Sequence, residues 1–100
     1  MRLGIMAAGG GGQGRIVGLV RAAVGRGHEV VIFATGGGTR LLADAAFTGL
    51  SRLPGVSMAY CDHSARLEGV ATAGLPAAIR RGSQLDNAVM AAEADKLVVL

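Results

Sequence analysis

The sequence has few aromatic residues, and its basic residues form no cluster. Phe, Tyr and Trp make up 3% of the 100 residues, so base stacking on aromatic rings has little to build on. The ten Lys and Arg residues are scattered singly, apart from the adjacent pair Arg80 and Arg81. Nucleic-acid binding usually needs a concentrated basic patch. We therefore expect no nucleic-acid partner.

Cysteine and histidine are also scarce. Cys61 is the single cysteine, so no disulfide can form within one chain. The two histidines are His28 and His63, and together with Cys61 they fall short of the four ligands of a structural zinc site. The sequence indicates neither a metal site nor a cofactor.

Long hydrophobic runs are missing as well. Gly, Arg and Asp interrupt every apolar stretch before it reaches the roughly 18 to 20 residues of a membrane-spanning helix. The apolar segment Leu3–Ala8 is shorter than the core of about 7–15 residues in a secretory signal. We expect a cytoplasmic protein with no membrane partner.

The chain is nevertheless unusually apolar for its length. Hydrophobic residues make up 51% of residues 1–100, charged residues 17%, and the mean hydropathy is +0.47. A chain this short forms one domain and buries only a modest fraction of its surface. Partner subunits are expected to cover the excess apolar area, which predicts a homo-oligomer.

Short β-branched runs alternate with segments of helical spacing. Strands are predicted at residues 2–7, 29–34, 56–61 and 96–100, with a short one at 77–80. Helices are predicted at 13–26, from Thr39 as the capping residue to Phe47, at 64–70 and at 83–94. Ser83 and Asp86 have the spacing of a capping box, and one stripe of the last helix holds Leu85, Ala88, Val89 and Ala92. The predicted fold is a single α/β domain, doubly wound, with an open and mostly parallel sheet of about five strands and helices on both faces.

A run of four glycines follows the first predicted strand. Gly9, Gly11 and Gly14 fit the G-x-G-x-x-G spacing of dinucleotide-binding loops, and free amides at a helix start can bind an anion. However, the second strand ends in "FATGGG", without the acidic residue that would hold a ribose, and no Walker lysine follows the loop. A simple turn is favoured, while nucleotide or phosphate binding by the Gly9–Gly14 loop, through Gly11 and Gly12, stays as an alternative.

Cys61 is the strongest candidate for chemistry. It ends the third predicted strand directly before a helix, at the sheet edge where parallel α/β proteins place their sites. A thiol there meets amide donors and the positive end of the helix dipole, which favour the thiolate. We take His63, Ser64 and Arg66 as supporting residues, with Asp62 opposing them. The alternative is a buried cysteine that acts only as a small hydrophobic residue.

A second glycine run, Gly36 to Gly38, follows the second predicted strand near the same edge. Gly36 and Gly37 either line the cysteine pocket or simply form the turn. The sequence does not decide between these two interpretations.

Residues across nearly the whole chain follow a known pattern. "GVSMAYCDHSARLEGV" combines Gly-Val at a strand start, a terminal cysteine, Ser-Ala in the turn and a later Gly-Val, and "ADKLVVL" closes the chain. In this order and spacing the chain resembles the DsrE/DsrF-like family of small sulfur-relay proteins, which includes the TusD-type carriers. Two features depart from the family's pattern: the glycines Gly9–Gly12 replace a more polar loop, and Asp62–His63 is not a fixed feature of the carriers.

The resemblance implies a function for Cys61. The cysteine would accept a sulfane sulfur as a persulfide from a donor protein and pass it to an acceptor protein, acting as a carrier or sulfurtransferase. It also implies a homo-oligomer, a trimer or a hexamer. The alternatives are a non-catalytic assembly or binding module of the same fold, and a protein that binds nucleotide or phosphate.

Overall fold

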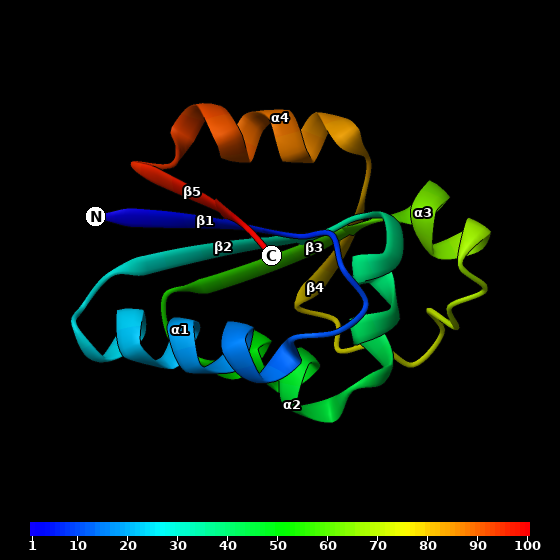
Figure 1. Cartoon of the computed structure of the whole chain (residues 1–100), viewed down its shortest axis with the longest axis horizontal. Coiled ribbons are helices and arrows are strands. Elements are labelled where there is room, and N and C mark those ends of the chain that lie inside the picture. The colour runs from blue at the N-terminus through cyan, green and yellow to red at the C-terminus, as the bar shows by residue number, and fades with distance from the viewer.

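A sheet of five strands, all parallel, forms the centre of the molecule (Figure 1). The computed structural model describes residues 1–100. The strands, in the spatial order β4-β3-β2-β1-β5, are β1 (Arg2–Ala7), β2 (Glu29–Ala34), β3 (Val56–Cys61), β4 (Ile79–Gly82) and β5 (Lys96–Val99). The predicted fold class is thereby confirmed, and the sheet is wholly rather than mostly parallel.

The helices cover the two faces of the sheet unequally. They are α1 (Gln13–Gly25), the 3₁₀ helix η1 (Gly36–Ala43), α2 (Ala45–Thr48), the 3₁₀ helix η2 (Gly49–Arg52), α3 (Asp62–Leu67) and α4 (Gln84–Glu93). Figure 1 shows α1 and α2 on one side of the sheet and α4 alone on the other. The longest helix, α1, has 13 residues, and no helix has both the length and the hydropathy of a membrane span.

Side-chain alternation along the strands divides the core into two clusters. The larger has 17 buried residues and lies on the α1 face, where Met58 and Tyr60 of β3 point. The smaller consists of Phe33, Ala59, Cys61 and Met90, on the α4 face. Because successive strand residues point to opposite faces, a cysteine at the last position of β3 is directed towards α4.

The segment after β2 differs from its prediction. We expected Thr39 to cap a helix, but η1 already begins at Gly36, and the Thr39 hydroxyl donates to the Gly36 carbonyl. Asp44 is the residue that caps: its carboxylate accepts the backbone N–H groups of Ala46 and Phe47 at the start of α2. The capping prediction was therefore wrong, because an acidic residue further along satisfies the free amides instead.

A close backbone contact explains why this segment is compact. A Cβ atom at Gly38 would overlap the carbonyl oxygen of Ala7, at the end of β1. Only glycine lets η1 pass so close to the strand. The glycine run after β2 therefore has a packing role.

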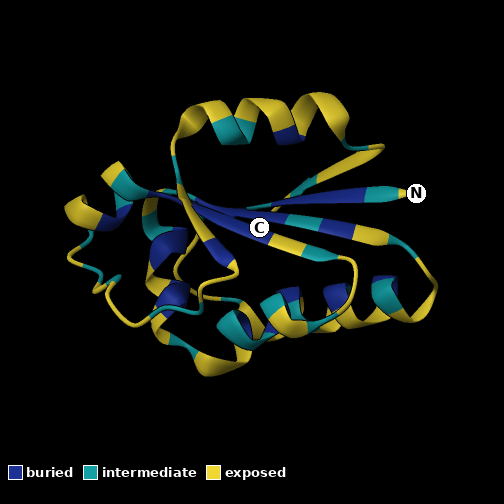
Figure 2. Cartoon of the chain, turned by 180° about the vertical axis from the view of Figure 1, so that it is seen from behind, coloured by how far each residue is buried: buried dark blue, intermediate teal, exposed yellow.

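Helix α4 begins as predicted but presents its apolar stripe outwards. Ser83 caps it, and Asp86 accepts the Ser83 backbone N–H, so the capping box is confirmed. Met90 is its only buried residue, whereas Leu85 and Val89 are 71% and 47% exposed. The exposed outer side of α4 is visible in Figure 2. The predicted stripe is thus left without a partner in the single chain.

Strand β4 is placed two residues later than predicted, at Ile79–Gly82 instead of 77–80. The register pairs Cys61 with Gly82 across β3 and β4. The carboxyl ends of these two strands therefore lie side by side, which decides what surrounds the thiol.

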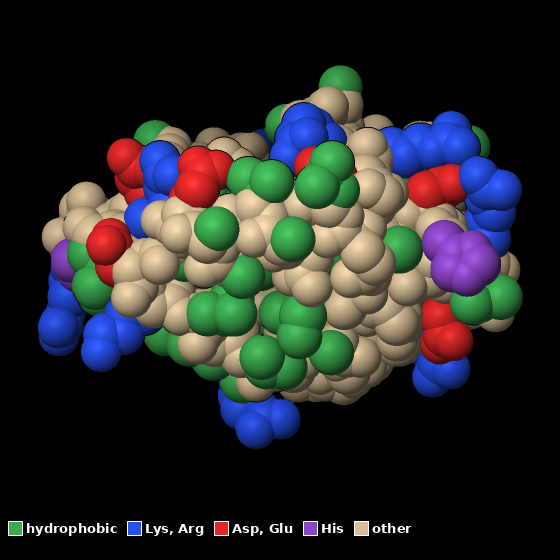
Figure 3. Space-filling model, turned by 90° about the horizontal axis from the view of Figure 1, so that it is seen from above, with side chains coloured by type: hydrophobic (Ala, Val, Ile, Leu, Met, Phe, Trp, Pro, Cys, Tyr) green, Lys and Arg blue, Asp and Glu red, His purple; other side chains and the backbone are tan.

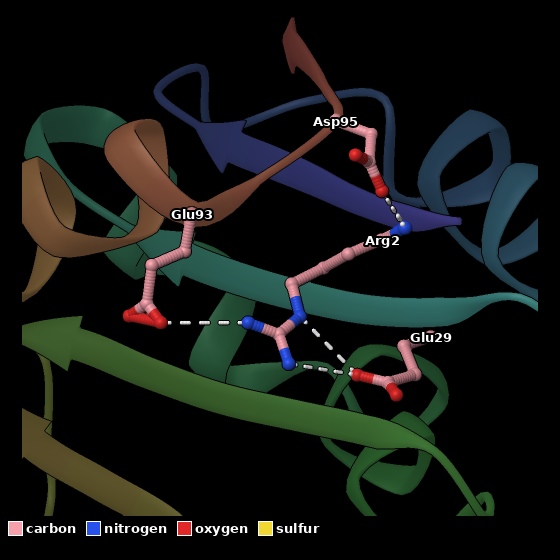
Figure 4. Close-up of polar contacts among 4 residues, drawn as sticks. All are labelled: Arg2, Glu29, Glu93 and Asp95. Atoms are coloured by element: carbon pink, nitrogen blue, oxygen red, sulfur yellow. Dashed lines mark hydrogen bonds and ion pairs between the residues drawn. The ribbon is translucent and has the colours of Figure 1, made fainter.

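Arg2 forms polar contacts at the other end of the sheet, where the strands begin (Figure 4). Its guanidinium pairs with Glu29 at 3.0 Å and with Glu93 at 3.4 Å, and its backbone N–H donates to Asp95 at 2.6 Å. These contacts tie the start of β1 to β2 and to the end of α4. Because the pairs are exposed, each contributes only about 0–1 kcal/mol.

Candidate functional site

Cys61 lies where the chain changes from one face of the sheet to the other. The connection after β3 packs on the α1 face through Ala65, Val70 and Leu75, whereas the connection after β4 is α4, on the opposite face. Neighbouring strands whose connections leave on opposite faces create a crevice at their carboxyl ends, and α/β proteins place ligands there.

An open cavity of about 780 Å³ occupies this crevice. It is lined by residues 61–64 and 66, at the end of β3 and in α3, and by residues 81–84 and 86, at the end of β4 and the start of α4. Nine of the ten lining residues are polar, charged or glycine, and Cys61 is the one hydrophobic member. The cavity therefore presents the thiol among hydrogen-bond donors.

Hydrogen bonds to the sulfur favour its charged form. Burial of Cys61, which is 3% exposed, raises the pKa of the thiol. Hydrogen bonds from the hydroxyl and backbone N–H of Ser64, the side chain of Gln84 and the backbone N–H of His63 lower the pKa by more than burial raises it. The net result is a pKa below the ordinary cysteine value. The donors arise because Cys61 occupies the N-cap position of α3, where amides are unpaired.

Gln84 connects three elements around the thiol. Its Nε2 atom donates to Oγ1 of Thr35 at 2.8 Å, and Thr35 Oγ1 lies 3.5 Å from Oγ of Ser64. Asn87, one turn further along α4, donates to Oε1 of Gln84 at 3.3 Å and so orients the amide. The sequence reasoning missed Gln84 and Thr35. The available signal was the capping box, which places Gln84 as the first residue of a helix that follows a strand.

The predicted supporting residues act in different ways. Ser64 bonds to the sulfur, whereas His63 contributes its backbone N–H and has an exposed side chain that lines the cavity. Arg66 donates to Asp62 through Nε at 2.9 Å instead of approaching the thiol. Asp62 also accepts from Arg81 at 3.0 Å. The hydrogen bond from Arg66, with the charges of both arginines, holds the pKa of Asp62 below its usual value despite partial desolvation.

The glycine candidates lie outside this cavity. Gly12 is the N-cap of α1 with φ of 89°, and Gly11 is exposed. Gly36, with φ of 53°, and Gly37 start η1, next to the loop that follows β1. None of the four cavities in the structure is lined by the Gly9–Gly14 loop or by Gly36 and Gly37. No group of three or more His, Cys, Asp or Glu side chains is arranged to hold a metal ion.

Comparison with known proteins identifies the fold. No protein-family profile matches the chain, and neither does any curated protein sequence. Among solved structures, the ychN protein from E. coli superposes with a TM-score of 0.76 at 14% identity, covering 100% of this chain and 99% of that one. A protein of unknown function, MTH1491 from Methanobacterium thermoautotrophicum, gives a TM-score of 0.71 at 17% identity, covering 99% and 98%. Both neighbours have the DsrE-like fold, and at these identities the likeness extends to the fold alone.

Proposed function

We propose that this protein, with its DsrE-like fold, relays sulfur through Cys61 in the manner of the TusD-type carriers. The observation that carries the proposal is the set of hydrogen bonds that lowers the pKa of a thiol in an open polar cavity. The thiolate, not the thiol, is the nucleophile in sulfur chemistry. A lone cysteine suits a carrier, because a disulfide reductase would need a second cysteine to resolve its intermediate.

The reaction needs no cofactor. The Cys61 thiolate attacks the terminal sulfur of a donor persulfide; a new S–S bond forms, the donor's S–S bond breaks, and the donor leaves as a thiolate. The proton of the donor's persulfide group ends on one of the two products. An acceptor thiolate then removes the sulfur by the same exchange, which regenerates Cys61. Donor and acceptor are both proteins in this proposal, and a reducing compartment such as the cytoplasm keeps the thiol available.

We further propose a homo-oligomer as the working form, a trimer or a hexamer. The α4 face carries exposed Leu85 and Val89 on the helix and exposed Leu97 and Val99 on β5. Hydrophobic side chains gather on this face in Figure 3. Partner subunits would cover them, in line with the apolar composition of the chain.

Intact-protein mass spectrometry tests the sulfur proposal. Wild type and Cys61→Ser are incubated with a sulfane-sulfur donor, and the expected result is a gain of one sulfur atom in the wild type only, reversed by a reductant. The opposing result is no gain, together with a Cys61 that resists thiol reagents until the protein is unfolded. Burial of the thiol to 3% exposure favours that second candidate, an assembly module with an inert cysteine.

A further inference from the structure

Two arginines that line the Cys61 cavity, Arg66 and Arg81, face outwards above the Asp62 carboxylate with which both pair, and Arg80 pairs with Asp86 from outside the cavity lining. The side chains of Arg66, Arg80 and Arg81 are 71%, 66% and 67% exposed. Their partners, Asp62 and Asp86, are only 17% and 25% exposed. The acids form the inner layer and the guanidinium groups the outer one, so an approaching molecule meets positive charge first.

The ion pairs with the carboxylates do not neutralise all of the positive charge on the arginines. Arg66 and Arg81 share the single carboxylate of Asp62, which leaves one positive charge in excess in this group, while Asp86, the other acid of the lining, is paired with Arg80. Arg80 donates to Asp86 through Nη1 alone, and Arg81 donates to Asp62 through Nη2 alone. A guanidinium has five N–H groups, so both side chains keep most of their donors for a further carboxylate.

We infer that the cavity mouth is a docking surface for an acidic protein segment, in which Asp or Glu residues flank the cysteine that exchanges sulfur with Cys61. The inference rests on the proposed sulfur relay and adds the chemistry of the partner. Charge complementarity of this kind mainly raises the association rate and selects among partners.

The shape of the site favours a peptide segment over a free anion. Cys61 is 3% exposed and is reached through an open cavity of about 780 Å³, large enough for several side chains. A cysteine at the tip of a loop can enter it while neighbouring carboxylates stay at the mouth, where the guanidinium groups lie. A small anion would need donors enclosing it, and the outward arginines do not enclose the cavity.

Activated peptides test this directly. Three peptides carry one cysteine as a 2-thiopyridyl disulfide, flanked by Glu, Gln or Lys, and attack by Cys61 releases uncharged 2-thiopyridone, which is followed by absorbance. At low salt the Glu peptide should react faster than the Lys peptide by roughly threefold or more, and salt should reduce the difference. In Arg66→Gln/Arg81→Gln the ratio of the Glu-peptide rate to the Lys-peptide rate should fall to one or below, whereas Arg21→Gln on α1 should leave the ratio unchanged.

The rate ratio separates the possible failures. A change in the reactivity of the thiol itself affects all peptides alike and cancels in the ratio, whereas the unpaired Asp62 carboxylate shifts the ratio in the same direction as the loss of the arginines. Equal rates for the Glu and Lys peptides, or a ratio unchanged in the double variant, overturn the inference and leave the sulfur relay standing. Charged small-molecule 2-thiopyridyl disulfides are assayed alongside the peptides, and a charge preference that appears with them alone overturns the protein partner in favour of an anionic small-molecule donor. If no disulfide reacts until the protein is unfolded, the relay itself is refuted.

Discussion

The backbone N–H of Ser64 donates to the Sγ atom of Cys61 at 3.5 Å, so that the thiol caps helix α3. Asp, Asn, Ser and Thr usually fill this position, because their oxygens accept the free amides of the first turn. A thiolate is a much better acceptor than a neutral thiol. The geometry that starts the helix therefore also stabilises the reactive form of Cys61.

Ser64→Ala should raise the pKa of the Cys61 thiol, because the substitution removes the hydroxyl donor that favours the thiolate while the backbone donor stays in place. Since the folded-state pKa lies below the ordinary value, the wild-type thiolate persists to lower pH than in a free cysteine. Thiolate absorbance or the alkylation rate measured against pH gives both curves. Ser57→Ala is the matched control, because Ser57 is exposed and lies on β3, the strand that ends at Cys61. Identical curves for Ser64→Ala and wild type would contradict the assignment.

Gln84 is expected to act on the thiol through its amide. Gln84→Ala should raise the pKa of Cys61, and Gln84→Glu should raise it further, because a carboxylate next to the sulfur opposes a second negative charge. Both substitutions lie on an exposed helix position, so the free energy of unfolding should change little. The pH profile of alkylation and a denaturation curve are measured on the same samples. A loss of stability with an unmoved profile would mean that Gln84 only holds α4 to Thr35.

Much of this site could be read from the sequence. The strand ending at Cys61 was predicted with its observed bounds, Val56–Cys61, because a short apolar run bounded by a glycine turn leaves little choice. Its position at the carboxyl edge followed from the parallel fold. The capping box at Ser83 was equally local, since both partners lie within one helical turn.

The surroundings of the thiol depended on contacts far apart in the chain. Gln84 meets Thr35 across 49 positions, and Arg81 meets Asp62 across 19. Neither contact has a sequence spacing that could reveal it. Strand β4 has only four residues, two of them arginines, so its hydrophobic pattern was too weak to fix the register that brings Gly82 beside Cys61. The prediction that Thr39 caps a helix failed for a similar reason, because the contact of Gly38 with Ala7, 31 positions earlier in the chain, cannot be seen from local spacing and helps decide where η1 lies.

Gly38→Ala should destabilise the protein by about 3 kcal/mol or more, because the added Cβ overlaps the Ala7 carbonyl and the backbone must move. Gly18→Ala is the matched control within α1, where nothing lies within 4 Å of the added carbon. That substitution should stabilise by about 0.5–1 kcal/mol through helix propensity. Chemical denaturation of both variants gives the two values. Equal effects would show that the close approach at Gly38 relaxes freely.

The exposed stripe of α4 predicts a change in assembly on substitution. Val89→Glu places a charge at a 47% exposed apolar position, which a subunit interface would have to bury unpaired. We expect the oligomer to dissociate, with the monomer still folded because Val89 lies outside both core clusters. Light scattering after size-exclusion chromatography measures the mass, and circular dichroism checks the fold. Gln13→Glu, at the exposed start of α1, adds the same charge and should leave the assembly intact. A wild type that is already monomeric, or a Val89→Glu variant of unchanged mass, would show that the α4 face is not an interface between copies of this chain.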